Sequence, residues 1–420
     1  MSRRQNVSES RYNAKAQSLR RKTAWMMENV DSLVHTVSAN EFALNDAIVS
    51  SVSGCETLCS YNWLKDGSGI VVPGNMNSKN GLELKLTTSA GGPPQWNPQP
   101  LPCTLPKDAG YSLEDAKAAK LPTYPYEPAF RALATMNPST KFDDIDIVTR
   151  RNSLRKLLDF AAGKAIDPFR MDLHMVNDTL FISRKEASAA FMIHGAHNSG
   201  HGHNFETRFT KPGNGLNQSH SHHRVVRYLL GHLNCVVQFE VDAYYDDDDG
   251  RHSGPSQPQD PVEDAVASMA NLSTRHARDS AFLAGAINVI HEGDLVDPAK
   301  LAELKLYGKN RRDPMPQIWF SRTPYLIEGR HVEGEVRSIR CTHVEAQFGT
   351  WEKDHQQALR KLVSLLDLLK SIVSGTENRS AILLCTDKGA PLTIFAAKNL
   401  GAVLPNDMTE MFWTVKDGVI

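Results

Sequence analysis

The sequence predicts a mixed α/β or α+β fold between about residues 125 and 400, because strand-like and helix-like segments alternate there. Two segments carry most of this prediction. "NCVVQFEVDAYY" (234–245) is rich in β-branched and aromatic residues, which is typical of a strand. "TWEKDHQQALRKLVSLLDLLKSIVSG" has an apolar stripe at helical spacing, with Thr350 as a plausible N-cap and Gly375 as its end, and predicts a helix.

Shorter segments complete this expected core. A helical stripe in "SLRKLLDFAAG" (153–163) ends at Gly163. Two short strands are expected on either side of Asn177 and Asp178, and a hairpin around "TDKGAP". Further strand-like runs lie at 301–307, 317–321, 325–330 and 335–341.

The composition divides the chain into segments. Residues 1–40 look like a basic, disordered tail, and the Arg, Lys and Ser content of its first half also fits an organelle presequence or a nuclear-import patch. Residues 41–124 are rich in Gly, Pro, Ser and Asn, which predicts loops. The domain at 125–400 contains an expected insertion at 246–290, and 401–420 form a C-terminal tail.

Charge and cysteine content narrow the function classes. The net charge of −1 gives no global basic field, so nucleic acid would have to bind a local patch. No apolar run approaches the length of a membrane span, so we expect no membrane association. The six cysteines show no paired metal-ligand spacing and are interpreted as free thiols. We expect an intracellular protein of the nucleus or cytoplasm, with the mitochondrion as an alternative.

Acidic residues at the end of the strand 234–245 suggest a metal site. Glu240 and Asp242 lie on one face of the strand, because side chains alternate with period two, and two such carboxylates can share a hard divalent cation. The alternative is a half-exposed strand with a polar face. The run of four aspartates at 246–249 lies beyond the strand and is interpreted as a solvated loop.

A second candidate pair occurs in "AELKLYG", where Glu303 and Lys305 share one face of a short strand. A metal-binding carboxylate beside a lysine that orients water is the arrangement needed for metal-assisted phosphodiester hydrolysis. The same triplet occurs at Glu83-Leu84-Lys85. The position of each copy relative to the other motifs therefore has to show which copy belongs to the site.

The order of these motifs resembles the eukaryotic decapping exoribonuclease family, a branch of the PD-(D/E)XK nuclease superfamily. The matching positions, between about Pro125 and Gly375, are Arg151 before a helix, "GHNFE" ending at Glu206, Glu240-Val241-Asp242, Glu303-Leu304-Lys305, Trp319 and "IEGRHVEG". The resemblance implies a mixed central sheet flanked by helices. It also excludes Glu83-Leu84-Lys85 from the candidate site, because this triplet precedes all the other motifs.

The resemblance also implies the roles of the matching residues. The carboxylates of Glu206, Asp242 and Glu303, with the carbonyl of Leu304, would hold one or two Mg²⁺ or Mn²⁺ ions. Glu240 would hold a water ligand of the metal.

Three further roles follow from the same resemblance. Lys305 would position the nucleophile, and Arg151 would contact a phosphate near the 5′ end of RNA. Ser321 stands where the family has a glutamine, so we expect it to line the substrate site. The implied protein is a metal-dependent hydrolase of RNA with a 5′ phosphate or cap, with a protein partner by analogy.

Three alternatives remain at this point. The chain could be an inactive nuclease-fold protein that binds RNA or a protein partner. The aspartate run invites an isoprenyl diphosphate synthase, but such enzymes are all-helical and carry two aspartate-rich motifs. The histidines at 194, 197, 201, 203, 220, 222 and 223 could bind zinc, although we prefer loop histidines near an anionic substrate.

Overall fold

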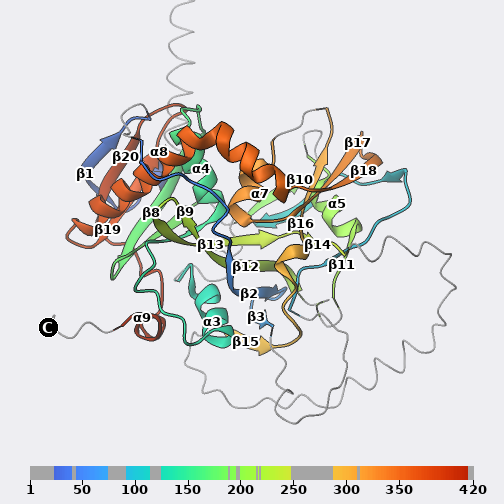
Figure 1. Cartoon of the computed structure of the whole chain (residues 1–420), viewed down its shortest axis with the longest axis horizontal. Coiled ribbons are helices and arrows are strands. Elements are labelled where there is room, and N and C mark those ends of the chain that lie inside the picture. The colour runs from blue at the N-terminus through green and yellow to red at the C-terminus, as the bar shows by residue number, and fades with distance from the viewer. Residues whose placement is uncertain are drawn as a thin grey trace, which may run out of the picture.

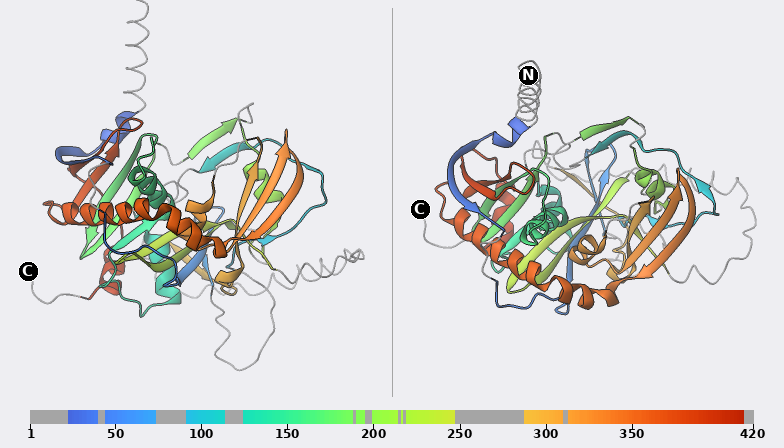
Figure 2. Two further views of the ribbon diagram at one scale, coloured as in Figure 1. Left: turned by 45° about the horizontal axis from the view of Figure 1, so that its top comes forward. Right: turned by 90° about the horizontal axis from the view of Figure 1, so that it is seen from above.

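The computed structural model contains two large β-sheets that lie next to each other (Figures 1 and 2). It describes residues 23–39, 44–73, 91–113, 124–187, 190–194, 199–213, 216, 219–246, 287–309 and 313–414. The expected mixed sheet flanked by helices is confirmed. None of the helices in these ranges is long and apolar enough to cross a membrane.

The larger sheet has eleven strands. Only the pairs β7–β9, β7–β13 and β3–β15 are parallel, and the other pairs are antiparallel, so the sheet is mixed. In spatial order its strands are β1 (Val30–Val37), β20 (Leu392–Ala397), β19 (Ser380–Cys385), β8 (Phe169–Val176), β9 (Thr179–Lys185), β7 (Ile147–Arg150), β13 (Leu233–Val241), β12 (Ser219–Leu230), β2 (Glu56–Leu64), β3 (Gly69–Val72) and β15 (Asn288–His291).

The smaller sheet has seven strands, and a separate two-stranded ribbon accompanies it. In spatial order the seven strands are β11 (Thr210–Lys211), β4 (Gln95–Trp96), β14 (Ala243–Tyr244), β16 (Leu301–Tyr307), β17 (Tyr325–Val332), β18 (Glu335–His343) and β5 (Cys103–Thr104). The ribbon pairs β10 (Ala190–His194) with β6 (Ala109–Leu113). Within the part of the chain that the structure describes, short 3₁₀ turns lie at Ala24–Met27, Pro298–Lys300 and Glu345–Gln347.

Helices cover both faces of the larger sheet. One core lies between that sheet and α4 (Arg151–Ala161), α7 (Met315–Ser321) and α8 (Phe348–Ser374). The core on the other face contains α3 (Glu127–Met136) and α9 (Asn406–Phe412), and includes Phe412 and Trp413. The smaller sheet packs against α5 (Gly202–Arg208) through Phe205 and Phe209.

Most of the predicted elements are confirmed. The helix expected from Thr350 begins slightly earlier, at Phe348, and ends before Gly375 as predicted. The turn at Asn177 and Asp178 joins β8 to β9, with Asn177 at a positive φ of 49°, a conformation that asparagine tolerates. The hairpin at "TDKGAP" joins β19 to β20.

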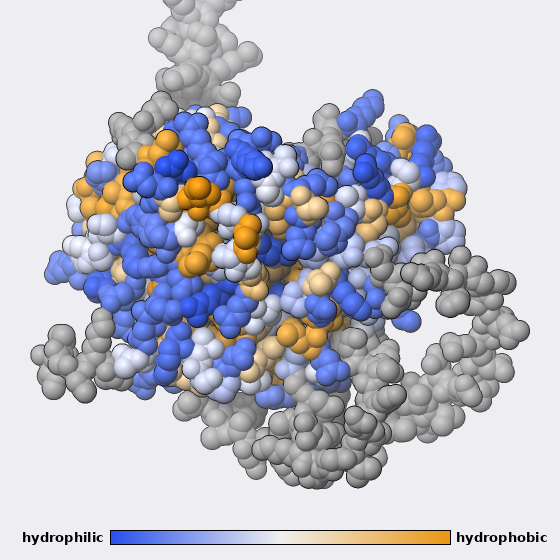
Figure 3. All heavy atoms as spheres, in the orientation of Figure 1, coloured by the Kyte–Doolittle hydropathy of each residue, from blue (hydrophilic) through white to orange (hydrophobic). Residues whose placement is uncertain are grey.

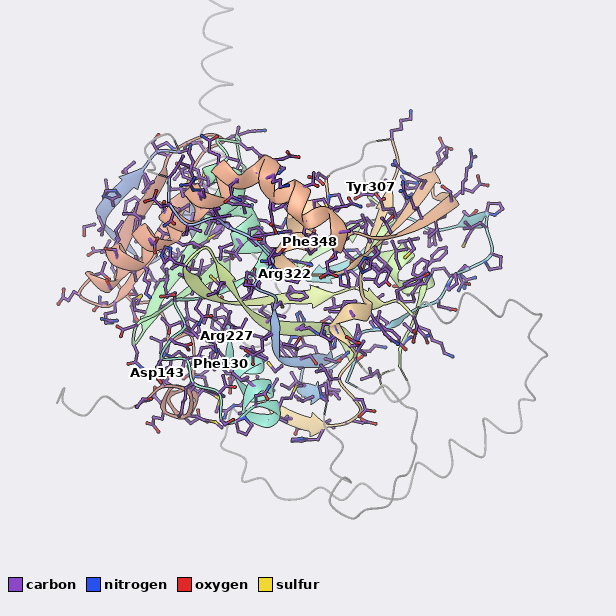
Figure 4. The ribbon with its side chains drawn as sticks, in the orientation of Figure 1. Phe130, Asp143, Arg227, Tyr307, Arg322 and Phe348 are labelled. Atoms are coloured by element: carbon purple, nitrogen blue, oxygen red, sulfur yellow. The ribbon has the colours of Figure 1, made fainter. Side chains whose placement is uncertain are left out.

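The predicted strand at 317–321 is wrong, because these residues form α7. Pro316 fits the first turn of a helix, where proline's missing N–H costs nothing. Ile318, Trp319 and Phe320 are all buried. The apolar run that suggested a strand therefore belongs to a short helix that the core surrounds. Arg322, which is labelled in Figure 4, ends the helix at φ 53°. Its guanidinium lies over the rings of Trp319 and Tyr228.

The segments outside 125–400 also contribute to the larger sheet and to the two cores on its faces. Strands β1, β2 and β3 belong to the larger sheet, and α9 packs with α3. Residues 247–286, most of the expected insertion, lie outside the described residues, as do residues 1–22 of the basic tail.

Glu352 connects three separate parts of this core. Its Oε1 accepts hydrogen bonds from the backbone N–H of Ser51 and from Nε1 of Trp319, each at 2.8 Å. Burial alone would raise the pKa of Glu352, but the hydrogen bonds from Ser51 and Trp319 lower it. The carboxylate therefore holds the 49–52 segment and α7 against the start of α8.

Replacing Glu352 with glutamine should lower the free energy of unfolding by about 1–2 kcal/mol at pH 7, because charge-assisted hydrogen bonds become neutral ones. The folded-state pKa lies below the unfolded one, so this stabilisation is present above about pH 4.3 and is lost as the pH falls further. Urea unfolding at pH 7 and pH 4 measures both effects. Glu377→Gln, at an exposed position, is the control, and an equal loss in both variants would contradict the prediction.

Candidate active site

The chain crosses from the larger sheet to the smaller one at Asp242. This residue separates β13, in the middle of the larger sheet, from β14, which pairs with β16. β14 is only two residues long, so β16 loses that neighbour beyond Ala302. Asp242 Oδ2 accepts a hydrogen bond from the N–H of Leu304 at 2.9 Å. The two predicted motifs, around Asp242 and around Glu303, therefore meet where the sheets join.

Arg151 reaches the same junction from the larger sheet. β7 runs directly into α4, and Arg151 is the first residue of that helix. Because β7 lies beside β13, with Arg150 opposite Gln238, the Arg151 side chain emerges next to the end of β13. Its guanidinium lies 5.6 Å from the Phe239 ring centroid. The strand and the helix together fix the position of this buried cation.

Glu303 is the most extensively paired carboxylate of the junction. Its side chain is 1% exposed, and Oε2 accepts a hydrogen bond from Arg151 Nη1 at 2.8 Å. Oε1 accepts hydrogen bonds from Lys305 Nζ and Gln317 Nε2. Burial alone would raise the pKa of Glu303, but Arg151 and Lys305 lower it to about 2. Glu303 therefore carries a full negative charge that two cations compensate.

Asp242 is much less well compensated. Burial, with repulsion from Glu303, raises the pKa of Asp242 to about 7, although Lys305, Arg151 and the Leu304 N–H act in the opposite direction. Lys305 Nζ lies 3.8 Å from Asp242 Oδ2. Burial alone would lower the pKa of Lys305, but Glu303 and Asp242 raise it, so the lysine remains an ammonium.

Glu206 approaches the junction from α5, a short helix held by Asp108. Asp108 Oδ1 and Oδ2 accept the N–H groups of Asn204 and His203, at 3.0 and 3.3 Å, in the helix's first turn. The Glu206 side chain is 42% exposed and therefore borders solvent. Partial burial raises its pKa well above the usual value, and repulsion from Asp242 adds to the effect.

Glu240 is the most exposed carboxylate of the group. Its side chain is exposed at the end of β13. The neighbouring protein groups still remove part of its hydration, and this partial desolvation raises the pKa of Glu240. Arg151 offsets part of the shift, whereas Glu303 adds repulsion. The structure thus brings together Arg151, Glu206, Glu240, Asp242, Glu303, Leu304 and Lys305.

Ser321 is the predicted site residue that the structure does not bring to the carboxylates. Its buried hydroxyl hydrogen-bonds the carbonyls of Gln317 and Ile318, each at 3.1 Å, and the hydroxyl of Thr323 at 2.7 Å. These partners lie within α7 and the turn after it. A Ser hydroxyl that bonds back to its own helix has little capacity left for a substrate.

Gln317 contacts the site instead, and sequence reasoning missed it. It lies one helical turn before Ser321, donates Nε2 to Glu303 and accepts Arg155 Nη1 at 3.0 Å on its Oε1. The position of Ser321 could have indicated Gln317, because residues four apart lie on the same face of a helix. It was hidden because residues 317–321 were expected to form a strand.

The donor set of the site suits a divalent cation by its chemistry. Carboxylate oxygens are the ligands that Mg²⁺ and Mn²⁺ prefer, and burial, together with repulsion between carboxylates, raises the pKa values of Glu206 and Asp242, a shift that a cation would oppose. Across the described residues, no three His, Cys, Asp or Glu side chains converge closely enough to form a metal site. Glu303 would have to exchange contacts with Lys305 or Gln317 for the ion.

The histidines that the structure describes, and Asp246 of the aspartate run, lie outside the group of carboxylates that meets at the junction. His222 and His223 are buried in β12 instead of a loop, and His222 Nδ1 contacts Asn62 Oδ1 at 2.8 Å. His203 lies 3.9 Å from Glu206, at the edge of the candidate site. Asp246, the first residue of the aspartate run, pairs with Lys300, and the other three aspartates lie outside the described residues.

We expect Mn²⁺ to stabilise the protein through Asp242. A folded-state pKa of about 7, above the unfolded value, means that the metal-free protein loses stability as the pH rises from about 4 to 7. A cation that offsets this charge should add about 2.7 kcal/mol at one hundred times its Kd, and more at pH 8 than at pH 6. Thermal unfolding with and without Mn²⁺ measures the gain.

Asp242→Asn should abolish the stabilisation by Mn²⁺, whereas Asp354→Asn, at an exposed position on α8, should retain it. An equal gain in wild type and Asp242→Asn would place the metal elsewhere.

Comparisons with known proteins agree with this fold. Scheffersomyces stipitis Rai1, in complex with (3′-NADP)⁺ and calcium, aligns with a TM-score of 0.54 at 11% identity, over 91% of this chain and 98% of that one. S. pombe Rai1 aligns with 0.51 at 13% identity, over 86% and 98%. Candida albicans Rai1, in complex with pU5 and Mn²⁺, aligns with 0.51 at 13% identity, over 91% and 99%.

Sequence comparison gives a family. No curated protein sequence matches the chain. A family described as "Domain of unknown function (DUF8563)" matches residues 31–413, which include every residue of the candidate site. The chain therefore belongs to the DUF8563 family.

Proposed function

We propose that this protein is a metal-dependent hydrolase of RNA 5′ ends, a divergent relative of the decapping exoribonucleases. It would cleave phosphodiester or phosphoanhydride bonds. The observation that carries the proposal is the convergence of Arg151, Asp242, Glu303 and Lys305 at the junction of two sheets. These residues come from three separate motifs, and their order in the sequence is the order in that family.

The similar solved structures support the proposal at the level of the fold. They are Rai1 proteins, and their complexes include one with pU5 and Mn²⁺ and one with (3′-NADP)⁺ and calcium. A 5′-phosphorylated RNA and a divalent cation are the substrate and cofactor that the acidic cluster and Arg151 would bind here.

Two features favour a phosphate at this site. Arg151 uses Nη1 for Glu303, which leaves other guanidinium N–H groups for phosphate oxygens. Arg151 also opens α4, whose N-terminus presents unpaired backbone N–H groups and the positive end of the helix dipole. We propose that the 5′ phosphate lies in front of this helix terminus, beside the carboxylates.

The chain's own residues would then act on water and phosphate. When bound, Mg²⁺ or Mn²⁺ supplies positive charge that offsets the charge on the pentacovalent phosphate. The Lys305 ammonium, held by Glu303, can donate a hydrogen bond that orients an attacking water. Glu240, accessible and with a raised pKa, can accept a proton from that water.

One observation favours the alternative, a nuclease-fold protein that binds RNA or a protein partner without cleaving RNA. Both Glu303 oxygens are bonded to cationic or amide donors of the protein itself. Such a carboxylate can serve as a structural ion pair. The alternative predicts RNA binding without hydrolysis and no dependence on a divalent cation.

The decisive experiment incubates the full-length protein with RNAs that carry a 5′ monophosphate, triphosphate or cap, in Mg²⁺ or Mn²⁺. We expect wild type to cleave at least one of them, and Asp242→Ala, Glu303→Ala and chelator to abolish cleavage. Asp354→Ala is the matched control. A folded wild type that cleaves none of the three RNAs would leave the binding protein as the better account.

A second comparison separates Gln317 from Ser321. Gln317→Leu should reduce kcat by roughly 10- to 100-fold, the usual cost of losing a group that orients a metal-binding side chain. Ser321→Ala should have little effect, because its hydroxyl is bonded within α7. Steady-state kinetics on the preferred RNA measures both variants. The opposite ranking would assign the substrate contact to Ser321.

A further inference from the structure

We propose that the exposed end of the β16–β18 face binds the RNA strand beyond its 5′ end, through Arg330 and Arg340. This inference rests on the proposed function, because it extends the same substrate. The same strand face that presents Glu303 and Lys305 continues across β17 and β18 to these two arginines.

Strand register places the residues on one face. In the parallel pair, Lys305 lies opposite Glu328, and Tyr307 opposite Arg330. In the antiparallel pair, Glu328 lies opposite Arg340. Residues that pair across strands project to the same side of a sheet. The Arg330 guanidinium lies 5.6 Å from the Tyr307 ring centroid, which agrees with this placement.

The opposite face of the sheet is closed. A Cβ added at Gly329 would lie 2.8 Å from Leu306 Cδ1 and 2.9 Å from Phe205 Cε2. Phe205 belongs to α5, which covers that side. Arg330, next to Gly329 in the strand, therefore points to the side of Glu303, away from α5.

Exposure along this face increases from the core outward. On β17, Leu326 is 3% exposed, Glu328 is 7% exposed, and Arg330 is exposed. Arg340 on the neighbouring strand is also exposed. Strongly hydrophilic side chains cover the outer end of this hairpin, at the upper right of Figure 3. A strand that leaves the buried carboxylates would meet the arginines as it reaches solvent.

The two arginines are not paired with carboxylates within the described residues. Neither Arg330 nor Arg340 forms an ion pair there. Glu328 is the acidic residue between them and Lys305, and its burial keeps it from a bound strand. Arg340 lies two strand spacings from Lys305, about 10 Å, so it can reach only a substrate longer than the reacting nucleotide.

RNA fits this face better than an acidic protein would. The reacting phosphate and the following phosphates belong to one polymer, and the two arginines continue the face on which the reacting phosphate would lie. Such contacts neutralise phosphates without reading bases, so they should depend on salt and strand length more than on sequence.

The test measures RNA binding by fluorescence anisotropy in chelator, where hydrolysis cannot interfere. The probes are 5′-monophosphorylated RNAs of two and fifteen nucleotides. The proteins are full-length wild type, Arg330→Ala/Arg340→Ala, and the charge-matched control Lys388→Ala/Lys398→Ala, whose exposed lysines flank β20 on the other sheet. Matching urea midpoints check that all three fold equally.

We expect the arginine double variant to bind the longer RNA about 25-fold more weakly at 0.1 M salt, with a salt slope smaller by about 1.4, as for two lost phosphate contacts on a single strand. Binding of the dinucleotide and of the control should not change. Equal binding of the longer RNA by the double variant and wild type would overturn the inference while leaving the proposed function intact.

Two other outcomes would also overturn the inference. If wild type binds neither RNA in chelator, the arginines hold no RNA and the inference fails, whereas the proposed function is judged by the cleavage experiment in Mg²⁺ or Mn²⁺. If the double variant instead loses binding to a polyglutamate peptide but not to RNA, the arginines bind an acidic protein.

Discussion

The buried contact between Arg151 and Glu303 is the interaction on which the arrangement of the site depends. Arg151 is positioned by β7 and α4 of the larger sheet, and Glu303 by β16 of the smaller one. Removing one partner of such a pair leaves an uncompensated charge in the interior, at a cost of about 3–5 kcal/mol. The pair therefore constrains how the two sheets meet, and hence where Asp242 and Lys305 lie.

The same contact distributes charge unevenly over the carboxylates. Glu303 receives both nearby cations and keeps a low pKa, whereas Asp242 and Glu206 have raised pKa values. Carboxylates in one site whose pKa values are driven apart are a common feature of functional sites. Of the carboxylates Asp242 and Glu206, Glu206 borders solvent, because its side chain is 42% exposed.

Gln317 on α7 contacts the carboxylates from a position that the sequence resemblance did not indicate. Ser321 stands where the resembling family has a glutamine, and Gln317 donates an amide to Glu303 from one helical turn earlier. Two residues four apart on a helix present their side chains to the same region. Gln317 therefore supplies an amide donor to Glu303.

The sequence alone determined the strands and helices with strong periodicity, such as β13, β16 and α8, and the identity of the acidic and basic residues. It did so because alternation and helical spacing are local properties of the chain. Only the tertiary structure decided that residues 317–321 form a helix, that Gln317 contacts Glu303 whereas Ser321 bonds within α7, and that Arg330 and Arg340 lie on the strand face of Lys305. Burial between two sheets and pairing between distant strands set these outcomes, and neither is encoded in a local pattern.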